Sequence, residues 1–225
     1  MEIYQTEEQQ IVMLKEFWKK NRLFFFLFVI VFGVALFGNH AWHNYEAQRN
    51  EKASNIYQDI LVAMQYVDVS KVKEKGELLL KDYNKTPYAA LSAMILAKIA
   101  IDEQDISGAM DKFRTVITSG KKTPLLHVAK IKLARLLQAK GEYQAALKEL
   151  DNSANGYITL YEELKGDIYL SLNELDKARE AYKKSISHAN GNPIPWVEMK
   201  LMNINIVEDV VNKGATDDSA VKINN

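Results

Sequence analysis

Apolar residues follow three patterns along this 225-residue chain, and each pattern predicts a different kind of helix. Near the N-terminus they recur with helical spacing, which predicts an amphipathic helix bearing Ile11, Leu14, Phe17 and Trp18. From Leu23 to Gly38 every residue is apolar or glycine. Beyond Trp42 apolar positions return at intervals of three and four as far as residue 211. An all-α fold is therefore expected, because no strand-like alternation competes with these patterns.

Residues 23–42 predict a single transmembrane helix. At about 1.5 Å per residue this run spans roughly the 30 Å hydrocarbon core of a bilayer. A buried core helix is the alternative, since the uninterrupted apolar stretch is short, but a helix that is apolar on every face would need a large domain around it. The cationic residues before the run orient the N-terminus towards the cytoplasm and the rest of the chain outside: Lys15, Lys19, Lys20 and Arg22.

A cleaved signal peptide has the same order of basic and apolar segments. The leader before this run contains four glutamates, however, and no clear cleavage triplet follows the run. We therefore expect an uncleaved signal anchor. Gly33 and Gly38 are small positions at which a neighbouring membrane helix can approach, although their spacing differs from the Gly-x-x-x-Gly pattern.

The part of the chain that follows the anchor repeats itself, in a manner that resembles tetratricopeptide helix pairs. Three segments align on Ala109, Ala146 and Ala178. A small residue stands twelve positions before each of these alanines, namely Ala97, Ala134 and Gly166. Small residues that face each other allow two antiparallel helices to pack closely. The repeats are divergent, because the tryptophan typical of the family is replaced by Ala93, Lys130 and Glu162.

These patterns divide the chain into five segments. We expect a cytoplasmic amphipathic segment at residues 1–22 and a transmembrane helix at 23–42. A linker helix and the first helices of the soluble domain follow at 43–86. Tetratricopeptide-like repeats with a C-terminal capping helix occupy 87–211, and a flexible tail occupies 212–225.

Composition argues against several classes of function. Lys and Arg number 29, equal to Asp and Glu, so no broad attraction to nucleic acid is expected. Cysteine is absent, and His40 with His43 supplies too few ligands for a structural metal site, so neither a metal nor another cofactor is expected. No phosphate-binding loop or catalytic triad order appears, which argues against an enzyme. Catalysis by the carboxylates around Glu162 and Glu163 is an alternative, but a solvated surface explains them.

Helix-pair arrays typically present a curved surface to another protein, lined by the first helix of each pair. The corresponding positions predict partner contacts at Leu91, Met94, Lys98, Val128, Ile131, Arg135, Gln138, Glu163 and Asp167. The mixture of apolar and charged residues suits a docked peptide or helix. Packing against neighbouring helices is the competing explanation for about half of them.

Four short stretches carry a resemblance to one family. They are Met1-Glu2-Ile3-Tyr4, Leu14-Lys15-Glu16-Phe17-Trp18, Pro87-Tyr88-Ala89-Ala90-Leu91 and Met202-Asn203-Ile204-Asn205. In these stretches and in its layout the chain resembles the YfgM family, the ancillary subunits of the bacterial SecYEG translocon. The resemblance covers roughly residues 1–211.

The resemblance implies a single-pass protein of the bacterial inner membrane with a periplasmic array. It implies partners in SecYEG and in a PpiD-like membrane-anchored foldase, contact with the lipid bilayer, and a role in passing exported polypeptides to periplasmic chaperones. It carries over no catalytic residue. The alternative is a tetratricopeptide scaffold for assembly of another envelope or secretion complex.

Overall fold

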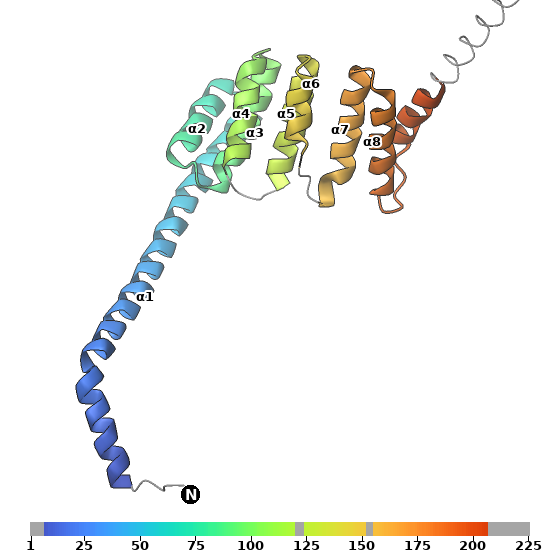
Figure 1. The fold of residues 1–225 in the computed structure, drawn as a ribbon. Helices are drawn as coiled ribbons and strands as arrows, with labels where there is room; N and C mark the ends of the chain where they lie inside the picture. The colour runs from blue at the N-terminus through green and yellow to red at the C-terminus, as the bar shows by residue number, and fades with distance from the viewer. Residues whose placement is uncertain (1–6, 120–123, 152–154, 207–225) are drawn as a thin grey trace, which may run out of the picture. The chain divides into compact units, whose positions relative to one another are not determined.

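The computed structural model describes residues 7–119, 124–151 and 155–206, except for some side chains near the N-terminus. All regular elements in these ranges are helical (Figure 1). They are α1 (Glu7–Gln65), α2 (Val69–Asp82), α3 (Pro87–Asp102), α4 (Ile106–Thr118), α5 (Pro124–Ala139), α6 (Tyr143–Glu149), the 3-10 turn η1 (Asn155–Tyr157), α7 (Ile158–Ser171) and α8 (Leu175–Ser187). Residues 195–206 form a further helix, called the last helix below. The all-α expectation is confirmed for the described residues.

The chain forms two compact units, Met1–Ser54 and Asn55–Asn225. In the first unit α1 is continuous from Glu7, so the amphipathic segment and the apolar run belong to one helix. Among the described residues, no helix is both long and apolar enough to cross a membrane. Gly33 and Gly38 are helical, but their surroundings fall outside the described part of the structure, as does the tail at 212–225.

The second unit is an array of antiparallel helix pairs, with α2 to α8 side by side in chain order (Figure 1). The small residues that the repeats predicted are buried where paired helices meet. Ala97 and Ala109 join α3 to α4, Ala134 and Ala146 join α5 to α6, and Gly166 and Ala178 join α7 to α8. The predicted repeats are therefore confirmed as helix pairs.

Larger apolar side chains fill the layers between these pairs. Phe113, Leu133, Leu150, Tyr161 and Ile168 are almost wholly buried in one cluster that extends from α3 to α7. Burial of this layer holds each pair against the next, because a single pair cannot enclose its own apolar face.

The end of α1 and α2 form an additional pair that the sequence comparison missed. Ile60 and Val72, both buried, stand twelve positions apart like Ala97 and Ala109. Gly76 lies against Leu96 of α3, where an added Cβ would meet the leucine at 3.0 Å. The repeat pattern did not reveal this pair, because it is defined by small residues and this pair has the larger Ile60 and Val72 at the same positions. Residues 43–86 thus contain a helix pair of the array.

The turn inside each pair has the same backbone hydrogen bonds. The residue just before the second helix donates its amide to a carbonyl five residues earlier, as in Asp68 to Ala63 and Asp105 to Ala100, at 2.9 and 2.8 Å. The residue before it takes a left-handed conformation, with φ of 57° at Val67, 63° at Gln104, 78° at Gly141 and 59° at Asn173. This geometry is a helix C-terminal turn that reverses the chain.

Proline and Asp residues define several helix starts. Pro87 and Pro124 begin α3 and α5, where the missing amide hydrogen is not needed. Asp68 and Asp105 accept amide hydrogens of Lys71 and Gly108 at 3.0 and 2.9 Å, and so cap α2 and α4.

The last helix packs on α8 as the expected cap. Val197 and Ile204 are buried beside Ala178 and Tyr182 of α8. The opposite side of this helix exposes Trp196, Met199 and Met202. Its expected continuation to residue 211 lies outside the described residues.

Candidate protein-interaction surface

The nine predicted contact residues lie on the first helices of three pairs. Lys98 of α3 and Arg135 of α5 are exposed, whereas Ile131 of α5 and Glu163 of α7 are buried. The other five are half-buried: Leu91, Met94, Val128, Gln138 and Asp167. Their common position is as expected, but their availability to a partner differs from helix to helix.

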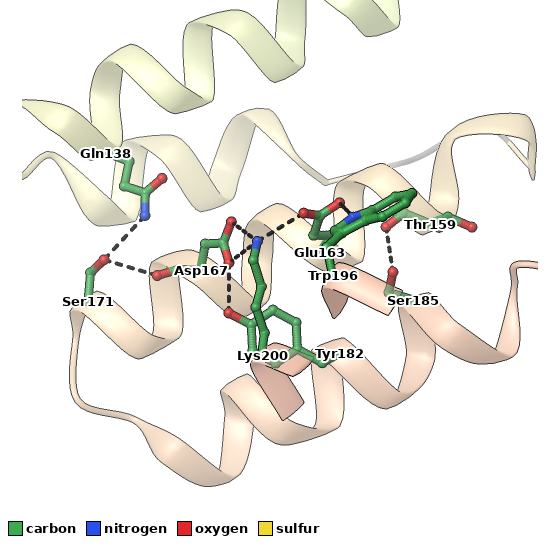
Figure 2. Close-up of polar contacts among 9 residues, drawn as sticks. All are labelled: Gln138, Thr159, Glu163, Asp167, Ser171, Tyr182, Ser185, Trp196 and Lys200. Atoms are coloured by element: carbon green, nitrogen blue, oxygen red, sulfur yellow. Dashed lines mark hydrogen bonds and ion pairs between the residues drawn. The ribbon is translucent and has the colours of Figure 1, made fainter. Parts of the chain in front are cut away.

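Glu163 and Asp167 hold the last helix in place (Figure 2). Lys200 Nζ lies 2.9 Å from Glu163 Oε1 and 2.8 Å from Asp167 Oδ1. Trp196 donates its indole hydrogen to Glu163 at 3.3 Å. Both acids are therefore occupied by the chain's own side chains, which gives them a role in positioning the cap.

Tyr182 completes this polar cluster. Its hydroxyl donates to Asp167 Oδ1 at 2.7 Å. Burial raises the pKa of Tyr182, and the hydrogen bond to Asp167 and the negative charges of Asp167 and Glu163 raise it further. Burial lowers the pKa of Lys200, but its hydrogen bonds to Asp167 and Glu163 outweigh that effect, so the net shift is upward. The cluster thus favours a neutral tyrosine and a charged lysine.

Gln138 and Arg135 differ although they are one turn apart on α5. Gln138 donates to Ser171 Oγ at 3.2 Å, and Ser171 donates to the carbonyl of Asp167 at 2.9 Å, which links α5 to α7 (Figure 2). Arg135 is exposed, and no ion pair to it is found among the described residues. Arg135 is therefore a predicted contact residue whose charge is exposed, unlike that of Lys98, which is paired with Asp102.

An apolar hollow of about 390 Å³ lies where the α1–α2 turn meets α3. We call it the Val67 hollow; its apolar lining comprises Met64, Val67, Val69, Val72, Met94, Ile95 and Ile99. Its polar border comprises Asp68, Lys98 and Asp102, of which Lys98 and Asp102 form an ion pair at 2.7 Å. The hollow brings together two predicted contact residues, Met94 and Lys98.

Sequence reasoning missed the α1–α2 side of this hollow. The available signal was the run Tyr66-Val67-Asp68-Val69, in which apolar residues stand at a turn. Tyr66 and Val67 are the most exposed large apolar residues of the array, at 80% and 79%. Apolar turn residues are unusual, because turns normally face water.

The carboxylates that were considered for catalysis are engaged in ion pairs. Glu162 is buried and accepts hydrogen bonds from Lys165 and Lys184, both at 3.0 Å. The ion pair between Glu162 and Lys184 joins α7 to α8. Within the described residues no group of three or more side chains suited to hold a metal comes together.

The fold and its surface define a class: an array of antiparallel helix pairs of the kind that binds other proteins. Residues 15–206 match the family model described as tetratricopeptide repeat-like domain. The chain belongs to this tetratricopeptide repeat-like family.

Relatives across most of the chain are named ancillary SecYEG translocon subunits. The chain is 28% identical to the protein of Aggregatibacter actinomycetemcomitans over 200 residues, which cover 88% of this chain and 97% of the relative. It is 26% identical to the protein of Escherichia coli K12 over 208 residues, which cover 92% and 100%. The resemblance expected from the sequence is confirmed.

A solved structure supports the fold. The crystal structure of MamA protein superposes with a TM-score of 0.57 and 19% identity, and covers 74% of this chain and 87% of that one. The likeness concerns the arrangement of helices alone.

Proposed function

We propose that this protein is a membrane-anchored periplasmic interaction module that acts beside the SecYEG translocon. The observation that carries the proposal is the likeness, over 92% of the chain and the whole length of the relative, to a protein named ancillary SecYEG translocon subunit. The tetratricopeptide repeat-like array supports a binding role without catalysis.

The anchor is the run from Leu23 to Trp42. All ten described side chains from Leu23 to Phe32 are exposed, so this part of α1 is apolar on every side. A helix of that kind is stable when lipid surrounds it. Lys15, Lys19 and Arg22 precede the run and support a cytoplasmic N-terminus with a periplasmic array.

The array serves as the docking surface in this proposal. Its partners are SecYEG and a PpiD-like foldase, and it helps to pass exported polypeptides to periplasmic chaperones. The contact residues are those whose side chains remain accessible, above all the exposed Arg135 and Lys98, together with the half-buried Met94 that lines the Val67 hollow. A tether raises the local concentration of partners, so weak contacts suffice.

Purification of the tagged full chain from membranes after mild solubilisation tests this proposal. We expect SecYEG and a PpiD-like foldase to co-purify with it. The charge reversal Arg135→Glu should reduce recovery of the partner that docks on the array. Lys132→Glu, an exposed residue of the same helix that was not among the predicted contacts, is the matched control. Failure of the wild-type chain to recover SecYEG would contradict the proposal.

Site-specific photocrosslinking in cells distinguishes the two ends of the molecule. A probe at Arg135 reports what the array touches, and a probe at Val34 reports what the anchor touches. Crosslinks from Val34 to SecYEG or to the foldase would support membrane contacts near Gly33 and Gly38. Crosslinks from both positions to a different envelope or secretion complex would favour the scaffold alternative.

A further inference from the structure

The four helix pairs found in the described residues carry different residues at one position of their turns. Three of them place Gln104, Gly141 and Asn173 in the left-handed conformation, whereas the α1–α2 pair places Val67 there. Glycine and asparagine tolerate this conformation well, but a β-branched residue is an outlier in it because its side chain crowds the backbone. The chain thus retains a β-branched residue at a position where its other turns have glycine, asparagine or the unbranched glutamine.

Burial does not explain the valine. Its side chain is 79% exposed, so it contributes little to the core of the array. It does line the Val67 hollow, together with Met94 and Ile95 of α3. Strain that is retained at an exposed position points to a function of the side chain itself.

The lining of the hollow determines what it can hold. Apart from its border the hollow is apolar, so it offers no hydrogen-bonding pattern with which to read a sequence. Met64 and Met94 have flexible, polarisable side chains that adapt to different shapes. A volume of about 390 Å³ takes a few large side chains and is too small to seat a folded domain.

The charges at the border of the hollow determine which segments can bind there. Asp68 caps α2 through the amide of Lys71, and Lys98 is paired with Asp102. The border therefore carries two carboxylates and one ammonium group, which leaves it with an excess of negative charge. An acidic segment would be repelled, whereas lysine or arginine beside apolar residues would be complementary.

We infer that the Val67 hollow binds an unfolded polypeptide segment that carries large apolar side chains, flanked by basic rather than acidic residues. The exported polypeptide as the source of this segment rests on the proposed function. The apolar side chains of the segment contact Val67 and Met94. The hollow recognises the segment by its shape and charge and not by a particular sequence.

The test measures binding of short fluorescent peptides to the full chain in phosphatidylcholine nanodiscs. One peptide has leucine and phenylalanine at its centre and lysine at its ends, a second has glutamate at its ends, and a third has serine at its centre. We expect the first to bind, and the second and third to bind at least about fivefold more weakly. Empty nanodiscs report adsorption to lipid.

Val67→Asn is the decisive variant. Asparagine suits the left-handed conformation, as at Asn173, so the midpoint of thermal unfolding should rise or stay unchanged. Binding of the first peptide should nevertheless weaken about fivefold. Tyr66→Asn, which removes an equally exposed side chain outside the hollow, should leave binding unchanged. Met94→Gln repeats the test on the α3 side.

Wild-type affinity in both Val67→Asn and Met94→Gln would overturn the inference. Equal binding of the peptide to empty nanodiscs would show that it adsorbs to lipid, which overturns the inference. If the wild-type chain self-associates in sedimentation and Val67→Asn does not, the hollow binds a second copy of the chain, which also overturns the inference. Co-purification with SecYEG is measured in parallel. Retained SecYEG with no peptide binding contradicts the inference alone, whereas Val67-dependent peptide binding without SecYEG contradicts the proposed function alone.

Discussion

The ring of Tyr182 lies directly against the backbone of Gly166. A Cβ added to Gly166 would overlap Cε1 and Cδ1 of the ring. The hydroxyl of the same tyrosine donates to Asp167, the next residue along α7. Tyr182 is fully buried, so it cannot move aside without opening the contact between α7 and α8.

Substitution of Gly166 by alanine should therefore destabilise the array. Alanine favours the helix by up to about 1 kcal/mol over glycine, but overlap with a buried ring costs about 1–3 kcal/mol. We expect Gly166→Ala to lower the free energy of unfolding by about 1–2 kcal/mol in urea denaturation. Gly156→Ala is the control, because its Cβ would meet nothing within 4 Å. Equal stability of the two variants would contradict the packing described.

The ion pairs of Lys200 should contribute more to the free energy of unfolding than ion pairs on the surface do. Glu163 and Asp167 are only 11% and 28% exposed, so Lys200→Met leaves two partly buried carboxylates without their cation. We expect a loss of about 2 kcal/mol and faster hydrogen exchange in residues 195–206. Lys98→Met removes the exposed pair with Asp102 and should change stability by less than about 0.5 kcal/mol. Unchanged exchange in the last helix would show that these acids do not position it.

Helix pairing could be predicted from the sequence because small residues recur at fixed spacing. Ala97 with Ala109 and Ala134 with Ala146 are buried in the contacts that this spacing predicted. The pair formed by α1 and α2 could not be found in that way, because the larger Ile60 and Val72 occupy the positions that small residues hold in the other pairs. Residues of several sizes can stand where two helices meet, whereas the repeat pattern identifies only the small ones, alanine and glycine.

The surface was predicted less completely than the fold. The helical register placed Glu163 and Asp167 correctly on the first helix of their pair. It could not show that Lys200, 33 residues after Asp167, neutralises both, because that contact depends on how the last helix folds back. The exposed apolar side of the Val67 hollow was missed for the same reason: it is formed by α1, α2 and α3 together.

Two buried tyrosines should make the array sensitive to alkaline pH. Burial raises the pKa of Tyr161 from 10.0 to about 12, assisted by the negative charge of Glu149, and the pKa of Tyr182 is raised as well. Their neutral forms are favoured in the folded chain, so this stability is fully present below about pH 10 and is lost as the pH rises through the folded-state values. Tyr161→Phe should weaken the dependence of unfolding free energy on pH above about 10. Tyr66→Phe, an exposed position, should leave the slope as in the wild type.

Substitution of two buried serines by alanine should change the free energy of unfolding in opposite directions. Ser92 and Ser185 are both fully buried, but within the described part of the chain the hydroxyl of Ser92 has no hydrogen-bond partner, whereas Ser185 donates to the carbonyl of Thr159 at 2.9 Å. Removing an unpaired buried hydroxyl relieves its desolvation, so Ser92→Ala should raise the free energy of unfolding by about 1 kcal/mol. Ser185→Ala loses a bond between α8 and α7 and should lower it by about 0.5–1 kcal/mol, after the better helix propensity of alanine is included. Urea denaturation of both variants measures the difference. A stabilising effect of Ser185→Ala, or a destabilising effect of Ser92→Ala, would mean that hydrogen bonding does not set the stability of these contacts.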